Sequence, residues 1–193
     1  MIDLADESGL FAGRQLAEFG AEVIRVEPPE GDPARFRQPF LDGKPGIERS
    51  LYHLHYNANK RSVTLDIHNT EGRETLRRLI DTADVVIETA QPGEMDSIGL
   101  GYDNLKTSNP GLLYVTITPF GQNGPKRHYR GNDLIGVATS GLMYLNGFPE
   151  DPPNQPGGEQ AYHMASIVAV SWIMMALAAR NRTSDGEGSR IDV

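Results

Sequence analysis

Short apolar runs alternate along this chain with longer segments in which apolar residues recur every three or four positions. The runs at residues 2–4, 23–26, 63–66, 85–88 and 113–118 have the length of buried strands. Strands that alternate with helical segments are typical of a parallel sheet connected by crossover helices. We therefore predict an α/β fold, and SDGEGSRIDV at the end of the sequence reads as the opening of one more strand.

The segments between the predicted strands carry helix signals. Residues 9–19 form a helical pattern that Gly20 would close, and Asn69 or Thr70 can cap a second helix. The apolar face of the first helix would consist of Leu10, Gly13, Leu16 and Ala17, and that of the second helix of Leu76, Leu79 and Ile80. A third helix is predicted over residues 133–144, with Asn132 and Asp133 as its cap.

Residues 161–179 are apolar nearly all round and approach the length of a membrane span. The segment contains Ser166 and Ser171 and is rich in alanine, which favours a buried core helix. We therefore expect a helix that runs to Arg180 inside the protein, and no membrane partner.

Charge and composition exclude several functions. The formal net charge is −8, and no face shows a basic excess, so nucleic acid is not an expected partner. The chain has no cysteine, which excludes disulfides, thiolate zinc sites and cysteine nucleophiles. The acidic start MIDLADESG does not have the pattern of a signal peptide. A cytoplasmic protein without a metal site is the natural expectation.

Common nucleotide and esterase motifs do not occur in the sequence. The first predicted strand is followed by DESGLFAG, which lacks the G-x-G-x-x-G of dinucleotide-binding folds. There is also no G-x-x-x-x-G-K-[ST] and no G-x-S-x-G. Nucleotide hydrolysis and serine-esterase chemistry therefore lack their motifs.

Four blocks in order resemble one family. They are GAEVIRVEPPEGDPAR at residues 20–35, NANKRSVTLDI at residues 57–67, DVVIETAQPG at residues 84–93 and ITPFGQNGP at residues 117–125. Together they resemble the class III CoA-transferases, a family of formyl-CoA transferase type that includes carnitine CoA-transferases and α-methylacyl-CoA racemases. Each block alone is a weak signal, and the ordered set is specific.

The resemblance implies an incomplete Rossmann-like parallel sheet with flanking helices. Residues 1–193 would be the N-terminal part of the large CoA-binding domain, ending before the small domain of a longer subunit. It also implies an interlocked homodimer, an acyl-CoA and a small carboxylic acid as substrates, and no permanently bound cofactor.

The family pattern suggests contacts for coenzyme A. Arg35 and Lys60 would bind its phosphates or adenine end as cations, and Arg130 lies where family members often carry a basic residue. Thr89 stands where the family usually has Asn, and Glu7 stands where transferases commonly have Gln near the thioester. Glu7 has a plain alternative role, because an acid favours the N-terminus of the following helix.

Class III transferases resemble one another in using an Asp carboxylate as nucleophile, placed just before the long apolar helix. Here that stretch reads GGEQAYHM, with Ala161, Tyr162 and His163 closest to the expected position. Glu159 is the nearby carboxylate and becomes the candidate nucleophile, and His163 the candidate general base. Glu159 can instead be an ordinary residue in the first turn of the helix, and His163 can be a structural hydrogen-bonding residue beside the helix start.

Three further interpretations stay open. The chain could be a CoA-binding member of the family that lacks the catalytic Asp, or an assembly fragment that needs more of its subunit. An acyl-CoA racemase or lyase is disfavoured, because the racemase His would fall at Asn132.

Overall fold

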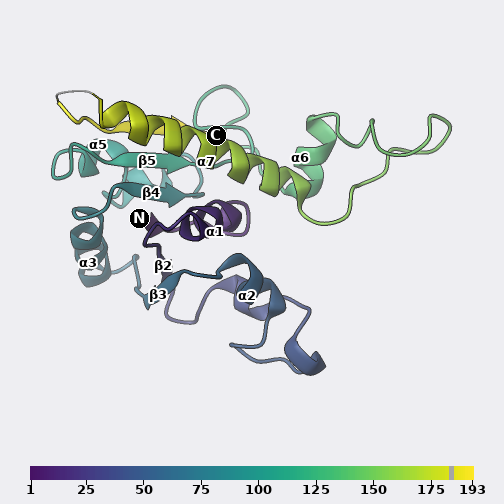
Figure 1. Ribbon diagram of the computed structural model, residues 1–193, viewed down its shortest axis with the longest axis horizontal. Helices are drawn as coiled ribbons and strands as arrows, with labels where there is room; N and C mark the ends of the chain where they lie inside the picture. Colours follow the sequence, from purple (N-terminus) through teal and green to yellow (C-terminus); the bar gives the residue numbers. More distant parts are fainter. Residues whose placement is uncertain (183–184) are drawn as a thin grey trace.

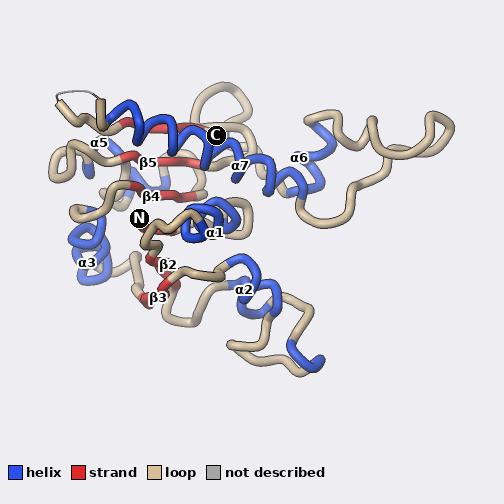
Figure 2. The backbone as a smooth tube through the Cα atoms, viewed as in Figure 1, coloured by secondary structure: helices blue, strands red, loops and turns tan. Residues whose placement is uncertain are grey.

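A computed structural model describes residues 1–182 and 185–193. Its centre is a parallel sheet with the strand order β3-β2-β1-β4-β5-β6, which Figures 1 and 2 show from the same side. The strands are β1 (Ile2–Asp3), β2 (Ile24–Glu27), β3 (Arg61–Thr64), β4 (Val85–Glu88), β5 (Leu113–Thr116) and β6 (Ser189–Asp192). The expected α/β fold with a parallel sheet and flanking helices is confirmed.

Helices cover both faces of this sheet. The helices of the described residues are α1 (Leu10–Glu18), α2 (Leu51–Tyr56), α3 (Thr70–Ile80), α4 (Glu94–Ser97), α5 (Tyr102–Leu105), α6 (Asp133–Thr139) and α7 (Gln160–Arg180), with 3-10 turns at Pro33–Phe36 and Leu41–Gly43. One core cluster packs α1 and α7 against the sheet, and the other packs α3, α4 and α5 against the opposite face.

The central strands are buried on both sides. In β4, Val86 faces the cluster of α3, while its neighbours Val85 and Ile87 face the cluster of α1 and α7. In β5, Tyr114 faces the cluster of α3, and Leu113 faces the cluster of α1 and α7. Because successive strand residues point to opposite faces, a continuous apolar run is what a strand covered on both sides requires.

The strand order reverses direction beside β1. From β1 the chain proceeds to β2 and β3 on one side, and β4, β5 and β6 follow on the other side. Loops that leave β1 and β4 therefore diverge at the carboxyl edge of the sheet. In open α/β sheets such a switch point is where ligands bind.

The sequence located most elements and misplaced some. The third strand starts two residues earlier than predicted, because Arg61 pairs with Ile24 at the sheet edge where apolar alternation is weak. The third helix ends at Thr139 rather than at 144, and Gly141 follows with φ +81°. The short helices α2, α4 and α5 were not predicted from the sequence.

Two neighbouring side chains cap two different helices. Asn132 caps α6 as predicted, since its side chain accepts the N–H of Ile135 at 3.0 Å. Asp133, by contrast, accepts the N–H groups of Ala161 at 2.8 Å and Tyr162 at 3.2 Å in the first turn of α7. The carboxylate of Asp133 therefore ties the start of α7 to α6, next to which α7 lies in Figure 1.

The expectation that α7 is buried on all sides is wrong. Ser166, Ala169, Val170 and Ile173 are buried, and they lie on the side that faces the sheet. The opposite face exposes large apolar side chains, namely Met164, Ile167, Val168, Trp172, Met174 and Met175. Among the described residues, α7 is also the one helix long and apolar enough to span a membrane, a property that core helices of soluble proteins share.

A buried network of charges joins β1 to its surroundings. Lys60 Nζ lies 2.8 Å from Asp3 Oδ2, and it also donates to the carbonyl of Leu10 and to Asn57 Oδ1. Arg25 Nη1 lies 3.0 Å from Asp3 Oδ1, and the side chains of Asp3 and Lys60 are 0% and 1% exposed. Burial opposes the charged form of Asp3, but Lys60 and Arg25 together lower the pKa of Asp3 below its usual range.

Gly13 makes room for this network. A Cβ atom at position 13 would lie 2.3 Å from Asp3 Oδ2, so any larger residue in α1 would displace the carboxylate. The glycine predicted on the inner face of the first helix therefore serves a close approach between α1 and a charged group of β1.

Replacing Lys60 with Met should lower the free energy of unfolding by about 3–5 kcal/mol, because Asp3 would keep its buried charge with one cation fewer. Far-UV circular dichroism in a urea titration measures this loss. Arg61→Met is the matched control, since Arg61 is 75% exposed and pairs with exposed Glu22. Equal midpoint shifts for the two variants would contradict a structural role for Lys60.

Candidate functional site

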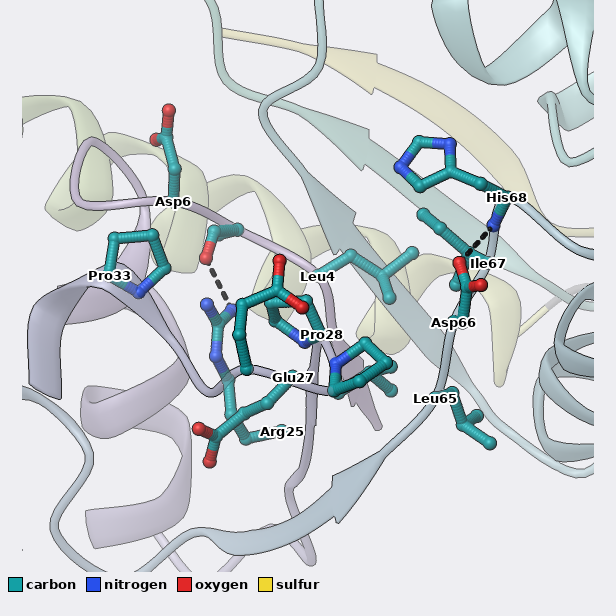
Figure 3. Close-up of a pocket in the computed structure, with 14 residues that line it drawn as sticks. Leu4, Asp6, Arg25, Glu27, Pro28, Pro33, Leu65, Asp66, Ile67 and His68 are labelled. Carbon is teal, nitrogen blue, oxygen red and sulfur yellow. Dashed lines mark hydrogen bonds between the residues drawn. The ribbon is translucent and has the colours of Figure 1, made fainter. Parts of the chain in front are cut away.

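A cleft opens at the carboxyl edge of the sheet beside the reversal between β1 and β4. It consists of two adjacent cavities of about 410 and 540 Å³ that share Leu4, Asp6, Ile67 and His68 in their walls. The first cavity, shown in Figure 3, lies over β1, β2 and the segment after β3, and the second lies between the loops that follow β1 and β4. We call these two cavities the switch-point cleft.

Carboxylates outnumber cations in the walls of the switch-point cleft. The acidic residues there are Asp6, Glu27, Glu30, Asp66, Glu88 and Glu94, whereas Arg25 and His68 are the lining residues that can carry positive charge. Arg25 is already neutralised by Asp3 and by Asp32, whose Oδ2 accepts from Arg25 Nε at 2.9 Å. Apolar side chains such as Leu4, Leu65, Ile67 and Ile98 complete the walls.

Glu88 ends β4 at the wall of the cleft and is only 4% exposed. Its Oε2 accepts the N–H of Ala90 at 2.6 Å. Burial, reinforced by the nearby charges of Glu94 and Asp96, raises the pKa of Glu88 to about 7. The carboxyl group therefore changes charge near neutral pH inside the candidate site.

Thr89, which the sequence analysis places where the family usually has Asn, also lines the cleft. Its Oγ1 accepts the N–H of Asp6 at 2.8 Å, so it joins the loop after β4 to the loop after β1. An Asn at this position would offer an amide to the ligand, whereas the Thr hydroxyl is used to hold the two loops together.

Arg35 and Lys60 do not form the expected cationic cleft. Lys60 points into the buried network around Asp3. Arg35 Nε lies 2.6 Å from Glu27, and its Nη1 lies 2.8 Å from Glu48. Hydrogen bonds from Arg35 and Ser62 outweigh the effect of burial and lower the pKa of Glu27 to about 2. Both cations are thus engaged by carboxylates and stand outside the walls of the switch-point cleft.

Glu159 belongs to a charged cluster with Glu7, Arg37 and Tyr52, which we call the Arg37 cluster. Arg37 Nη1 lies 2.7 Å from Glu7 Oε2, and Arg37 Nη2 lies 2.8 Å from Glu159 Oε1. Tyr52 donates its hydroxyl to Glu159 Oε2 at 2.6 Å, and its ring lies 4.0 Å from the Arg37 guanidinium carbon. Burial raises the pKa of Glu7, assisted by the charge of Glu159 and opposed by Arg37.

The geometry thus brings Glu7 and Glu159 together through Arg37, a cation that the sequence analysis did not single out. Glu159 precedes α7 at its N-cap position but makes no cap hydrogen bond with its side chain. Both of its oxygens are engaged by Arg37 and Tyr52. Its side chain is 17% exposed, so a reactant could still approach it.

His163 lies in the first turn of α7 beside the Arg37 cluster. Its Nε2 is 2.7 Å from the hydroxyl of Tyr56, and its ring centroid is 4.7 Å from that of Phe11. A hydrogen bond to Tyr56 orients the imidazole and occupies one ring nitrogen. This arrangement fits the structural alternative for His163 as well as a role in proton transfer.

Another cavity, of about 250 Å³, opens where α6 and α7 meet the end of β5. It is lined by residues that include Ser8, Thr118, Ile135, Ala161, Tyr162 and Ala165, and we call it the α6–α7 cavity. Two of the three positions expected to replace the family's Asp, Ala161 and Tyr162, therefore face a cavity. Burial raises the pKa of Tyr162 to about 12, so its phenol stays neutral.

Two aromatic positions of the site were not singled out from the sequence. Tyr52 and Tyr56 are four residues apart on α2, so they share one face of that helix. The signal was present in LYHLHY, which has helical spacing but is too short to stand out.

Arg130 is exposed in the loop before α6, outside the cleft walls. No cluster of metal-ligating residues is found in the described part of the chain.

Curated relatives match along the whole chain. The BbsE subunit of succinyl-CoA:(R)-benzylsuccinate CoA-transferase from Thauera aromatica is 39% identical over 193 residues, which are 100% of this chain and 47% of the relative. Succinate–glutarate CoA-transferase from Agrobacterium fabrum is 40% identical over 189 residues, which are 96% of this chain and 47% of the relative. The chain thus spans about half the length of these relatives.

Solved structures give the same result. A CAIB/BAIF family protein from Brucella suis superposes with a TM-score of 0.91 at 39% identity, covering 99% of this chain and 50% of that protein. Rv3272 from Mycobacterium tuberculosis superposes with a TM-score of 0.85 at 34% identity, covering 98% and 53%. The family model described as CoA-transferase family III matches residues 7–193. The chain therefore belongs to CoA-transferase family III.

Proposed function

We propose that the protein transfers coenzyme A between an acyl-CoA and a carboxylic acid, with the coenzyme bound in the switch-point cleft. The observation that carries the proposal is the position of this cleft, which lies at the β1–β4 reversal of a family III chain. The name of one relative includes succinyl-CoA and that of another includes succinate, so succinyl-CoA is the first donor to test, with a second carboxylic acid as acceptor.

The charges in the cleft constrain how coenzyme A would lie. Its apolar pantetheine arm and adenine ring suit walls such as Leu4, Ile67 and Ile98. Its phosphates would be repelled by Asp6 and Glu30, so they should stay at the solvated rim, where His68 is the exposed lining residue that can become cationic. In this proposal, Arg35 and Lys60 do not bind the phosphates, in contrast to the expectation from the sequence.

Glu159 is the nucleophile that we propose for the chemical step. Its carboxylate oxygen would attack the thioester carbonyl, the C–S bond would break, and CoA would leave as a thiolate, giving a mixed anhydride on Glu159. The thiolate would then attack the Glu159 carbonyl, release the first carboxylate and leave a CoA thioester on the enzyme. An acceptor carboxylate would reverse these two steps. Because Arg37 and Tyr52 stabilise the Glu159 anion, one of them must withdraw before attack.

A second candidate is a subunit that binds coenzyme A without performing the chemistry. The engagement of both Glu159 oxygens favours this alternative, because a carboxylate held by a cation and a phenol is a weak nucleophile. The absence of any carboxylate at Ala161, Tyr162 and His163 points the same way. The transferase and the subunit that only binds coenzyme A differ in whether incubation with acyl-CoA forms a covalent adduct on Glu159.

The intact protein, incubated with succinyl-CoA, should gain hydroxylamine-sensitive CoA on Glu159, detected by mass spectrometry of its peptides. Glu159→Gln should abolish the adduct and lower transfer at least a hundredfold, while exposed Glu150→Gln, outside the cluster, should leave both unchanged. Turnover by the Gln variant at the wild-type rate would eliminate Glu159 as nucleophile. Tight CoA binding without any adduct or turnover would instead support the second candidate.

Replacing His68 with Glu should weaken the binding of coenzyme A about tenfold or more, because it removes a potential cation from the shared wall and adds a charge that repels phosphate. His68 is exposed, so the fold should tolerate the change. Isothermal titration calorimetry of the intact protein measures the effect, and His128→Glu, also exposed but outside the cleft, is the matched control. If both variants lose affinity equally, coenzyme A binds elsewhere.

Glu88 should make ligand binding depend on pH. Its carboxyl is neutral below about pH 7 and ionised above it, so wild-type affinity for CoA should fall more steeply between pH 6 and pH 8 than that of Glu88→Gln. In the unfolded chain this carboxyl has its ordinary pKa of 4.5, so the stability of the wild type should also fall between pH 4.5 and 7, by about 3 kcal/mol relative to Glu88→Gln. Parallel pH profiles for the two proteins would show that Glu88 is not the titrating group.

A further inference from the structure

We propose that the α6–α7 cavity binds the uncharged hydrocarbon part of an acyl group, such as a phenyl ring or a branched alkyl chain, and not a second carboxylate. The inference rests on the proposed function, because it assigns one part of the transferred acyl group to this cavity. The benzylsuccinate in the name of one relative carries a phenyl ring as well as carboxylates, and the inference assigns the hydrocarbon part of such an acyl group, not a carboxylate, to this cavity.

The first support is the chemistry of the lining. Its apolar part comes from residues such as Ile117, Pro119, Ile135 and Ala165, and its polar part from hydroxyl and amide side chains. No Lys, Arg, His, Asp or Glu stands among the lining residues described. A carboxylate in this cavity would lose hydration without meeting a cation, whereas a hydrocarbon loses nothing by leaving water.

The second support is a buried hydroxyl that lacks a partner. Thr118 is 8% exposed and lines the cavity, and its Oγ1 has no hydrogen-bond partner among the described residues. Buried hydroxyl groups are nearly always paired, so the structure favours a ligand that brings one polar atom. The carbonyl oxygen of a thioester or a single hydroxyl would meet this need.

The third support is the relation of the cavity to the cleft. Asp6 lines the switch-point cleft and Ser8 lines the α6–α7 cavity, and the two are joined because Asp6 Oδ1 accepts the Ser8 N–H at 2.9 Å. The loop after β1 therefore has coenzyme A on one side, by our proposal, and the α6–α7 cavity on the other. A thioester crossing this loop would place its acyl group in the cavity.

The size of the cavity limits the acyl group. A cavity of roughly 150 Å³ suffices for a benzene ring, and this one measures about 250 Å³. A phenyl ring with a short linker therefore fits. Long straight acyl chains would need to leave the cavity through its open side.

The test uses the intact protein with Glu159→Gln, in which the proposed adduct cannot form, and compares its affinities for free CoA, phenylacetyl-CoA, isovaleryl-CoA and succinyl-CoA by isothermal titration calorimetry. The affinity for each acyl-CoA is divided by the affinity for free CoA, so that the contribution of the switch-point cleft cancels. We call this ratio the gain of that acyl-CoA. The two hydrocarbon thioesters should bind at least tenfold more tightly than CoA, and succinyl-CoA should gain less than threefold. A larger gain for succinyl-CoA than for phenylacetyl-CoA would overturn the inference.

Two variants locate the effect in the cavity. Ile135→Lys places a cation at its exposed wall and should bring the gains of phenylacetyl-CoA and succinyl-CoA to parity or reverse their order, with little risk to the fold because Ile135 is 39% exposed. Ala165→Leu fills the cavity and should cancel the phenylacetyl gain. Exposed Ala178→Leu on the same helix is the matched control and should change neither ratio.

The outcomes separate the two proposals. If the protein without cavity substitutions binds neither free CoA nor any acyl-CoA, the proposed function itself is rejected. Normal CoA binding with an unchanged phenylacetyl gain in both cavity variants would reject only the assignment of the acyl group to the α6–α7 cavity. Urea titration of each variant shows whether it is folded before its affinity is interpreted.

Discussion

The carboxylate of Asp3, held by Lys60 and Arg25, fixes the carboxyl end of β1, where the candidate site lies. β1 is only two residues long, so backbone pairing alone gives it few hydrogen bonds. Asp3 attaches it to β2 through Arg25 and to the start of β3 through Lys60. Because the loop after β1 separates the switch-point cleft from the α6–α7 cavity, the positions of both depend on this ion network.

The same use of cations explains the acidic character of the cleft. Arg25, Arg35 and Lys60 come from the sequence blocks that resemble the family, yet each is bound to internal carboxylates. The charges that a phosphate ligand would attract are therefore committed to the fold. Near the catalytic candidate, Arg37 has a comparable part, since it joins Glu7 to Glu159 and restrains both. Binding and chemistry in this protein depend on rearranging or replacing such pairs.

The fold was largely predictable from the sequence, because strands buried on both faces consist mainly of consecutive apolar residues. The residues VVI of β4 are an example. The edge strand β3 was shifted, since exposure on most of its residues removes that signal. The site was less predictable. A cation such as Lys60 looks the same in the sequence whether it faces a ligand or a buried carboxylate, and the partner of Glu159, Tyr52, is 107 positions away along the chain.

Asp133 has a consequence for how the long connection between α6 and α7 can vary. Its carboxylate holds the first turn of α7 directly, so the position of that helix does not depend on the path of residues 144–154. In this stretch Tyr144 and Leu145 are 85% and 80% exposed. The entropic cost of closing a loop grows slowly with its length. This part of the connection is therefore the natural place to insert an affinity tag or attach a fluorophore while both helices keep their places.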